Sequence, residues 1–229
     1  MEHKTLIQAH DLVIGYRHHT VLSGLDFSLA EGELTCLMGF NGAGKSTLIK
    51  TLCGMIPAVS GQFETHGRIG VVLTEKGNAG GLTVYELVSL GRYRHTDFFG
   101  SLKESDHKAI KAALSAVGMD RKSDKYVSQI SDGERQKAFI AKALAQECPI
   151  IILDEPTAFL DVTSRVEMMV LLRRLAHEEG KAILISTHEL DNALSYADTI
   201  WLLSEEKGII SGTPASLTES GTIKSFFKI

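Results

Sequence analysis

Three shortages in this chain of 229 residues narrow the kinds of protein that it can be. Its only cysteines, Cys36, Cys53 and Cys148, lie far apart, so we expect neither a disulfide framework nor a metal site of C-x-x-C type. No apolar run approaches the roughly 18 residues that are needed to cross a bilayer. Basic residues are not in excess, since 24 Lys and Arg stand against 28 Asp and Glu, and we expect no nucleic-acid partner.

The remaining composition fits a folded protein of the cytosol. Hydrophobic residues make up 44% of the chain, which is ordinary for a globular protein, and the length suffices for one large domain. Free cysteines suit a reducing compartment, and the first residues lack the apolar stretch of a signal peptide. We therefore expect cytosolic synthesis and retention.

The first part of the chain predicts strands, a glycine-rich loop and a helix. Apolar and polar residues alternate along Leu25–Leu29, as in a half-buried strand, and Val13–Arg17 precedes a polar turn. Leu34–Met38 is almost entirely apolar, as in a strand that is covered on both faces. Good helix formers then run from Lys45 to Cys53.

The middle of the chain, roughly residues 75–148, predicts three helices. A capping-box sequence that starts at Thr83 opens the first, and Ser105 is a candidate cap for the second. The third runs from about Glu134 to Ala145. After residue 150, strands and helices alternate, which predicts a mostly parallel sheet. The expected strands there are 150–153, 182–186 and 199–203, and the expected helices are 165–177 and 189–196.

A glycine-rich segment at Gly39–Ser46 matches the phosphate-loop pattern G-x-x-x-x-G-K-S. Its glycines let main-chain amides come close to phosphates. Lys45 is expected to reach the β- and γ-phosphates, and the Ser46 hydroxyl to bind Mg²⁺. A chance match is the alternative, which the flanking strand and helix disfavour. The expected nucleotide-binding residues here are Gly39, Asn41, Gly42, Ala43, Gly44, Lys45, Ser46 and Thr47.

Two adjacent carboxylates, Asp154 and Glu155, end the apolar run Ile150–Leu153. A strand there would deliver both to the carboxyl edge of the sheet, where ligands of open α/β folds bind. Asp154 is expected to hold Mg²⁺ through water, and Glu155 to act as general base on the attacking water. A strand that simply ends in an acidic turn is the alternative, and the upstream phosphate loop disfavours it.

Between these motifs, Ile130-Ser-Asp-Gly-Glu134 resembles the signature motif of ABC-type ATPases, usually written L-S-G-G-Q. From about residue 5 onward, the whole chain resembles one ABC nucleotide-binding domain in the order and spacing of its motifs. The resemblance implies that Ser131 and Gly133 contact the γ-phosphate that a second copy binds, whereas an ordinary helix cap would explain Ser131 alone. Asp132 and Glu134 replace a glycine and a glutamine, and both add negative charge near the polyphosphate.

The same resemblance gives roles to three further positions. Tyr16 stands where an aromatic side chain stacks on adenine, although an ordinary strand-edge tyrosine is about as good an interpretation. Asp161 belongs to a loop that crosses the dimer interface, and His188 matches the switch histidine that senses the γ-phosphate. The expected catalytic residues are Glu155, His188 and Lys45.

Glu75, or Thr74 under a shifted alignment, stands where the family has a glutamine after the strand that begins the helical subdomain. A glutamate offers Mg²⁺ a charged oxygen in place of a neutral one and would hold the ion more strongly. We expect Glu75 to keep the Mg²⁺ and coupling roles, which makes Ser46, Glu75 and Asp154 the expected metal ligands.

The resemblance implies an α/β fold of the P-loop NTPase, ABC type. It has a mixed sheet core, an antiparallel β subdomain and an inserted helical subdomain. Residues 1–229 would form a single ABC ATPase domain, with the ATP-binding core and β subdomain in 1–74 and 149–229 and the helical signature subdomain in 75–148.

The stretch Thr83–His95 resembles the ATPases of iron-siderophore, haem and vitamin B12 importers, in which T-V-x-E-L-V runs into G-R-x-P-H. Arg94 stands where that pattern has proline. A soluble ABC ATPase not tied to transport, the ATPase of another importer or exporter class, and a P-loop kinase or GTPase are the alternatives.

Each composite ATP site of this family needs two domains, so the resemblance implies a homodimer. Integral membrane permease subunits are the other expected partners, and a substrate-binding protein would be an indirect one. ATP and Mg²⁺ are the expected cofactors. The expected location is peripheral, on the cytoplasmic face of the inner (plasma) membrane.

Glu75→Ala is expected to lower ATPase activity, to raise the Mg²⁺ concentration that half-maximal activity requires, and to weaken coupling to transport. Titration of Mg²⁺ against the ATPase rate measures the first two effects. Thr74→Ala is the matched control, and a loss there instead of at Glu75 would favour the shifted alignment. Unchanged activity, Mg²⁺ dependence and coupling in Glu75→Ala would refute the assignment.

Overall fold

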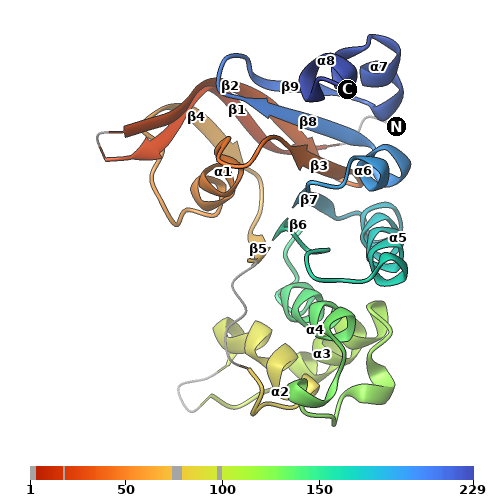
Figure 1. The fold of residues 1–229 in the computed structure, drawn as a ribbon. Coiled ribbons are helices and arrows are strands. Elements are labelled where there is room, and N and C mark those ends of the chain that lie inside the picture. The colour runs from red at the N-terminus through yellow and green to blue at the C-terminus, as the bar shows by residue number, and fades with distance from the viewer. Residues whose placement is uncertain (1–3, 18, 74–78, 97–99) are drawn as a thin grey trace.

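The computed structural model describes residues 4–17, 19–73, 79–96 and 100–229, and the fold is drawn in Figure 1. Glu75 and Thr74 lie outside the described residues. Two sheets form the upper part of the molecule in that view. One has three antiparallel strands in the order β2-β1-β4, and the other has six strands in the order β5-β6-β7-β3-β8-β9. The expected mixed sheet with an antiparallel β subdomain is therefore confirmed.

Two strands of the first sheet are longer than the short segments predicted for residues 1–38, and its third strand, β4, was not predicted. Their bounds are β1 Thr5–Tyr16, β2 His19–Ala30 and β4 Ser60–Thr65. In the second sheet, all neighbours pair in parallel except β8 and β9, which are antiparallel. Its bounds are β3 Leu34–Met38, β5 Ile69–Val72, β6 Ile150–Asp154, β7 Ala182–Ser186, β8 Thr199–Ser204 and β9 Gly208–Gly212.

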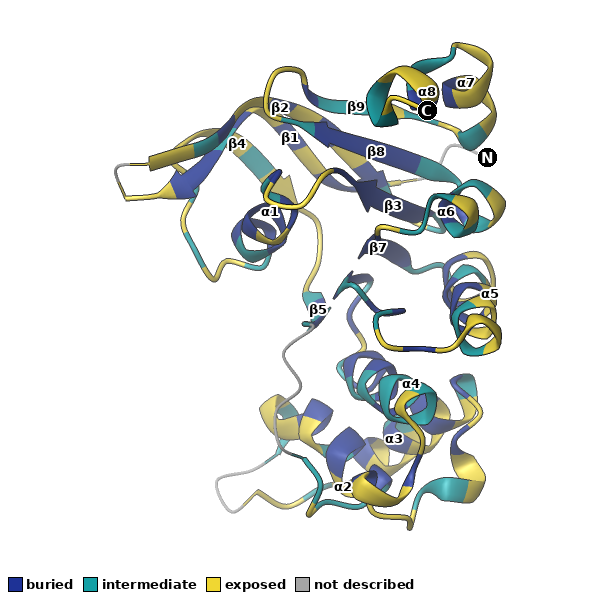
Figure 2. Cartoon of the chain, viewed as in Figure 1, coloured by how far each residue is buried: buried dark blue, intermediate teal, exposed yellow. Residues whose placement is uncertain are grey.

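The central strands are buried on both faces, and Figure 2 shows β3, β7 and β8 mainly in dark blue. Because side chains alternate along a strand, β6 contributes to two cores. Ile150 and Ile152 pack with the antiparallel sheet and the first helix, whereas Ile151 and Leu153 pack with the helices on the other side. This burial on both faces explains why the strands read as continuous apolar runs.

Helices cover the sheet and form a separate group below it in Figure 1. Beside the sheet lie α1 Lys45–Leu52, α5 Val162–Glu179, α6 Leu190–Tyr196, α7 Pro214–Glu219 and α8 Thr222–Phe227. The lower group contains α2 Val84–Ser89, α3 Glu104–Ala116 and α4 Asp132–Leu144, with the 3₁₀ turn η1 Leu90–His95 after α2. It also contains the shorter 3₁₀ turns η2 Asp120–Lys122 and η3 Val127–Gln129. The three helices predicted between the two nucleotide motifs are thus present.

The start of α2 follows the prediction and the start of α3 does not. The Thr83 hydroxyl accepts a hydrogen bond from the Glu86 amide at 3.1 Å, and the Glu86 carboxylate accepts one from the Thr83 amide at 2.8 Å. Ser105, the predicted cap, lies inside α3. That helix begins earlier because the Asp106 carboxylate accepts a hydrogen bond from the Lys103 amide at 2.9 Å.

A buried arginine joins the elements of the lower group. Arg92 of η1 is 4% exposed, and its Nε donates to the Asp106 carboxylate of α3 at 2.9 Å. Its Nη1 donates to the Ala145 carbonyl at 2.8 Å and to the Glu147 carboxylate at 2.5 Å. Charge-assisted bonds of this kind hold η1, α3 and the end of α4 in one arrangement.

Candidate functional site

The phosphate loop lies between β3 and α1 and is shaped by a tight turn. The Ala43 amide donates to the Phe40 carbonyl at 3.1 Å, and Gly42 at the third position of this turn has a φ of 84°. Gly44, which precedes α1, has a φ of 95°. These left-handed backbone angles favour glycine at both positions.

Lys45 is folded back onto its own loop. Its Nζ donates to the Gly39 carbonyl at 2.8 Å and to the Phe40 carbonyl at 3.1 Å. Burial lowers the pKa of Lys45, while the negative charges of Glu155 and Asp154 act in the opposite direction. The two hydrogen bonds hold the Lys45 side chain against the loop.

Close packing also fixes the two ends of the loop. A Cβ on Gly39 would lie 2.8 Å from the Leu203 carbonyl oxygen, and one on Gly44 would lie 2.8 Å from Leu22 Cδ1. Thr47 is buried in the first turn of α1, whereas Asn41 and Ser46 are exposed. The loop therefore presents polar groups to solvent on a backbone that its neighbours support.

Asp154 lies at the carboxyl end of β6 and faces the start of α1. The Ser46 hydroxyl donates to Asp154 Oδ2 at 3.3 Å, and the Ser186 hydroxyl donates to Asp154 Oδ1 at 2.6 Å. The Ser186 oxygen also accepts a hydrogen bond from the Glu155 amide at 2.9 Å. Ser186 of β7 thus holds both acidic residues at the strand end.

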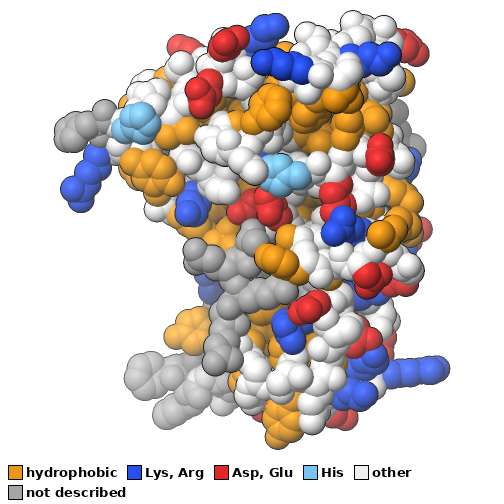
Figure 3. Space-filling model, in the orientation of Figure 1, with side chains coloured by type: hydrophobic (Ala, Val, Ile, Leu, Met, Phe, Trp, Pro, Cys, Tyr) orange, Lys and Arg blue, Asp and Glu red, His pale blue; other side chains and the backbone are white. Residues whose placement is uncertain are grey.

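Glu155 and His188 form a direct pair. His188 Nε2 lies 2.7 Å from Glu155 Oε1, and the two side chains are 41% and 34% exposed. Glu155 has a φ of 49°, a left-handed conformation that is uncommon for a residue with a Cβ. On the face drawn in Figure 3, acidic side chains and a histidine gather near the middle, where β6 and β7 end in Figure 1.

The signature segment begins α4, in the lower group of helices. The Ser131 hydroxyl caps the helix by accepting from the Glu134 amide at 3.3 Å. The negative charges that Asp132 and Glu134 add to this segment are partly offset, because Asp132 pairs with Arg135 at 2.9 Å and Glu134 pairs with Lys122. The hydrogen bond from Lys122 is the main cause that lowers the pKa of Glu134.

Asp161, Gly133 and Tyr16 lie at three other elements, the start of α5, α4 and β1. Asp161 caps α5 by accepting from the Ser164 amide at 3.0 Å, and this hydrogen bond lowers the pKa of Asp161. A Cβ on Gly133 would lie 3.5 Å from Ser164 Oγ, which places the signature helix beside the Asp161 loop. Tyr16 ends β1 and is 47% exposed.

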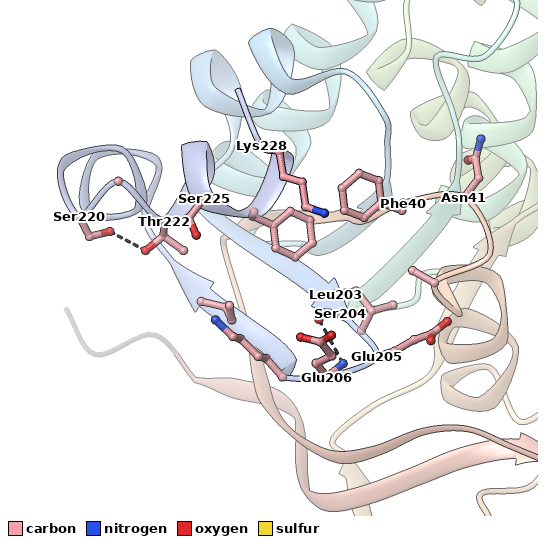
Figure 4. Close-up of a pocket in the computed structure, with 15 residues that line it drawn as sticks. Phe40, Asn41, Leu203, Ser204, Glu205, Glu206, Ser220, Thr222, Ser225 and Lys228 are labelled. Carbon is pink, nitrogen blue, oxygen red and sulfur yellow. Dashed lines mark hydrogen bonds between the residues drawn. The ribbon is translucent and has the colours of Figure 1, made fainter.

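A cavity of about 640 Å³ adjoins the phosphate loop, between α8 and the turn that joins β8 to β9 (Figure 4). Phe40 of the loop stacks on Phe226 of α8, with ring centroids 5.6 Å apart, and meets the edge of Phe227 at 6.0 Å. Asn41 and Ala43 line this cavity, but the carboxylates at the end of β6 do not. This cavity is therefore separate from the carboxylate site at the end of β6.

Oxygen donors suited to Mg²⁺ lie on two facing elements. Ser46 and Asp154 offer a hydroxyl and a carboxylate, the hard ligands that Mg²⁺ prefers together with substrate phosphates. Across the residues that the structure describes, no group of three or more His, Cys, Asp or Glu side chains could hold a metal ion.

The family model described as ABC transporter matches residues 22–158, which include the phosphate loop, the signature segment and both carboxylates. The chain belongs to the ABC transporter family. The resemblance to ABC-type ATPases is confirmed, and so is the prediction that the chain is an ATPase. This ABC cassette binds ATP and hydrolyses it.

Relatives resemble the cassette over nearly its whole length. The iron(3+)-hydroxamate import ATP-binding protein of Bacillus subtilis is 34% identical over 97% of this chain and 88% of its own. The ferric enterobactin transport ATP-binding protein of Escherichia coli is 32% identical over 96% of this chain and 86% of its own.

A solved structure of an ABC transporter described as metal-chelate type, in an inward-facing conformation, has a TM-score of 0.90. Its sequence is 27% identical, and the match covers 99% of this cassette and 90% of that chain. No helix among the described parts of the cassette is long and apolar enough to cross a bilayer.

The structure brings the phosphate loop, Asp154, Glu155 and His188 together, as the motifs predict. Sequence reasoning missed Ser186, which connects the two carboxylate residues. The sequence signal for Ser186 was its place as a hydroxyl residue at the end of an apolar strand. Such a residue lies at the same edge of a parallel sheet as Asp154.

Ser186→Ala is expected to lower the kcat for ATP hydrolysis about tenfold or more, because the Glu155 amide loses its partner and Asp154 loses its anchor. The KM for ATP should change less, since the phosphate loop is unaltered. Steady-state ATPase assays measure both constants.

Thr35→Val is the matched control for this loss. Thr35 lies on the neighbouring strand β3, and among the described residues its buried hydroxyl has no hydrogen-bond partner. The control should keep its activity. A Ser186→Ala cassette with the kcat of the parent would contradict the role given to Ser186.

Proposed function

We propose that this cassette powers a membrane importer of iron-siderophore, haem or cobalamin type. The observation that carries the proposal is the catalytic pair of Glu155 with His188 beside a complete phosphate loop, in a chain whose relatives include siderophore transport ATPases. The segment Thr83–His95, which includes α2 and η1, supports the importer class because its sequence resembles the T-V-x-E-L-V and G-R-x-P-H stretch of those ATPases.

In the proposed mechanism Lys45 leaves the two loop carbonyls and neutralises charge on the β- and γ-phosphates. Glu155 accepts a proton from the attacking water, and His188 orients Glu155 and the γ-phosphate. Positioning and electrostatics carry most of such phosphoryl transfers. Tyr16 is proposed to stack on adenine.

Mg²⁺, held by Ser46, Asp154 and Glu75, would neutralise developing phosphate charge when it is bound. Ser46 and Asp154 support this proposal because their oxygens already meet across α1 and β6. Glu75 lies outside the described residues, and its role stays the sequence-based prediction given above.

A second copy of the cassette is proposed to complete each ATP site. Ser131 and Gly133 lie at the start of α4, where helix-terminal amides attract anions. The Asp161 loop carries the exposed side chains Phe159 and Val162, each 77% exposed, which suit a contact with that copy. A substrate-binding protein would act only through the permease.

Permease subunits are proposed to dock in a groove between the helical group and the sheet. This groove of about 410 Å³ is lined by η1, β5 and the end of α4. Arg68, Arg94 and Lys142 give it positive charge, and the exposed Leu90 and Tyr93 give it an apolar rim. It therefore fits a cytoplasmic permease segment with acidic and apolar side chains, and binding would keep the cassette at the inner face of the membrane.

Glu155→Gln is expected to bind ATP, to accumulate as a closed dimer and to lose about 100-fold or more of its turnover. Gel filtration with ATP measures the dimer, and phosphate release measures the turnover. Glu178→Gln, which alters an exposed carboxylate on α5, should behave as the parent. Normal hydrolysis by Glu155→Gln would refute the base assignment.

Arg94→Glu is expected to reduce the amount of polytopic membrane protein that co-purifies with a tagged cassette from detergent-solubilised membranes of its native host. The ATPase site is untouched, so ATP binding should persist. Lys111→Glu, on the exposed side of α3, makes the same charge change away from the groove and should retain the partner. Equal recovery with both variants would contradict docking at this groove.

A further inference from the structure

Arg165 lies in the first turn of α5 and contacts two segments that are far apart in the sequence. Its Nε donates to the Leu160 carbonyl at 2.7 Å. Its Nη1 lies 3.2 Å from Glu189 Oε1, with the Arg165 side chain 38% exposed and the Glu189 side chain 23% exposed. One guanidinium therefore spans from the loop after β6 to the loop after β7.

The first of these segments carries Glu155. The Ala158 amide donates to the Glu155 carbonyl at 3.1 Å, and the Leu160 amide donates to the Thr157 carbonyl at 3.2 Å. Two residues of this short loop are left-handed, with φ of 49° at Glu155 and 66° at Phe159. Such conformations persist only when surrounding contacts hold them, and the bond from Arg165 to Leu160 is one of those contacts.

The second segment carries His188. Glu189 follows it directly, and the Glu189 amide donates to the Thr187 hydroxyl at 3.1 Å. The Glu189 carboxylate also accepts a hydrogen bond from the side chain of Asn192. Glu189 is thus fixed at the start of α6, and through Arg165 it is tied to the Glu155 loop.

The geometry points to Arg165 as a positioning residue for the catalytic pair. Glu155 and His188 lie 2.7 Å apart, and Arg165 contacts the segment that carries each of them. This inference rests on the proposed function, because it assumes that Glu155 is the general base. Arg165 acts through these two segments, by its contacts with the Leu160 carbonyl and the Glu189 carboxylate.

Arginine suits this bridge better than lysine does. Its planar fork supplies separate donors to a carbonyl and a carboxylate at fixed angles, whereas an ammonium is a single point donor on a flexible stem. An ion pair with this exposure contributes little stability by itself. The main effect of the contact is therefore to fix the positions of the two loops. Small displacements of reacting groups lower the rate of a reaction by large factors.

Steady-state ATPase kinetics of Arg165→Ala test the inference. We expect kcat to fall about 10-fold to 100-fold with the KM for ATP and the ADP-induced rise in melting temperature nearly unchanged. Arg165→Lys should recover only part of the loss. Glu167→Gln is the control, because Glu167 lies on α5 as Arg165 does and forms an ion pair of 3.0 Å with Lys137 of α4. This variant should match the parent.

A double variant separates positioning of Glu155 from a general loss of structure. In single-turnover assays, Arg165→Ala combined with Glu155→Gln should be no slower than Glu155→Gln alone, since both changes remove the same contribution. A further fall in the double variant, or a kcat for Arg165→Ala within twofold of the parent, would overturn the inference. Normal hydrolysis by Glu155→Gln would instead overturn the proposed function.

Discussion

The parallel pairing of β6, β7 and β3 is the constraint on which the catalytic edge depends. The register sets Asp154 opposite Ser186, and Ser186 also lies opposite Leu37 near the end of β3. Parallel strands end at one edge, so the phosphate loop after β3 and the acidic residues after β6 meet there. A shift of one residue would reverse the side chains of β6 and turn Asp154 away from Ser46.

The strands bring Asp154, Glu155 and His188 to one edge of the sheet, and hydroxyl and guanidinium groups then fix their positions more closely. Ser186 holds the Glu155 amide and the Asp154 carboxylate, while Arg165 connects the loops that carry Glu155 and His188. These groups lie behind the atoms that would meet ATP. Their contacts support the left-handed conformation of Glu155, and phosphoryl transfer depends on such fixed positions.

The family, the mixed sheet and the helices between the motifs could be predicted because their signals are local. A phosphate loop needs glycines at set positions, and apolar runs mark strands that are covered on both faces. Helix starts follow local signals only in part. The capping box at Thr83 is present, but α3 is capped two residues before Ser105, because the Asp106 carboxylate accepts a hydrogen bond from the Lys103 amide.

By itself, the sequence determined the family and the order of the nucleotide motifs, since motif spacing depends on short stretches of backbone. The tertiary structure alone decided that Ser186 bridges Asp154 and Glu155, and that Arg165 joins the loop that carries Glu155 to the loop that carries His188. Those partners lie up to 32 positions apart along the chain. Only strand register and helix packing bring such groups within hydrogen-bond distance, and no local pattern encodes that distance.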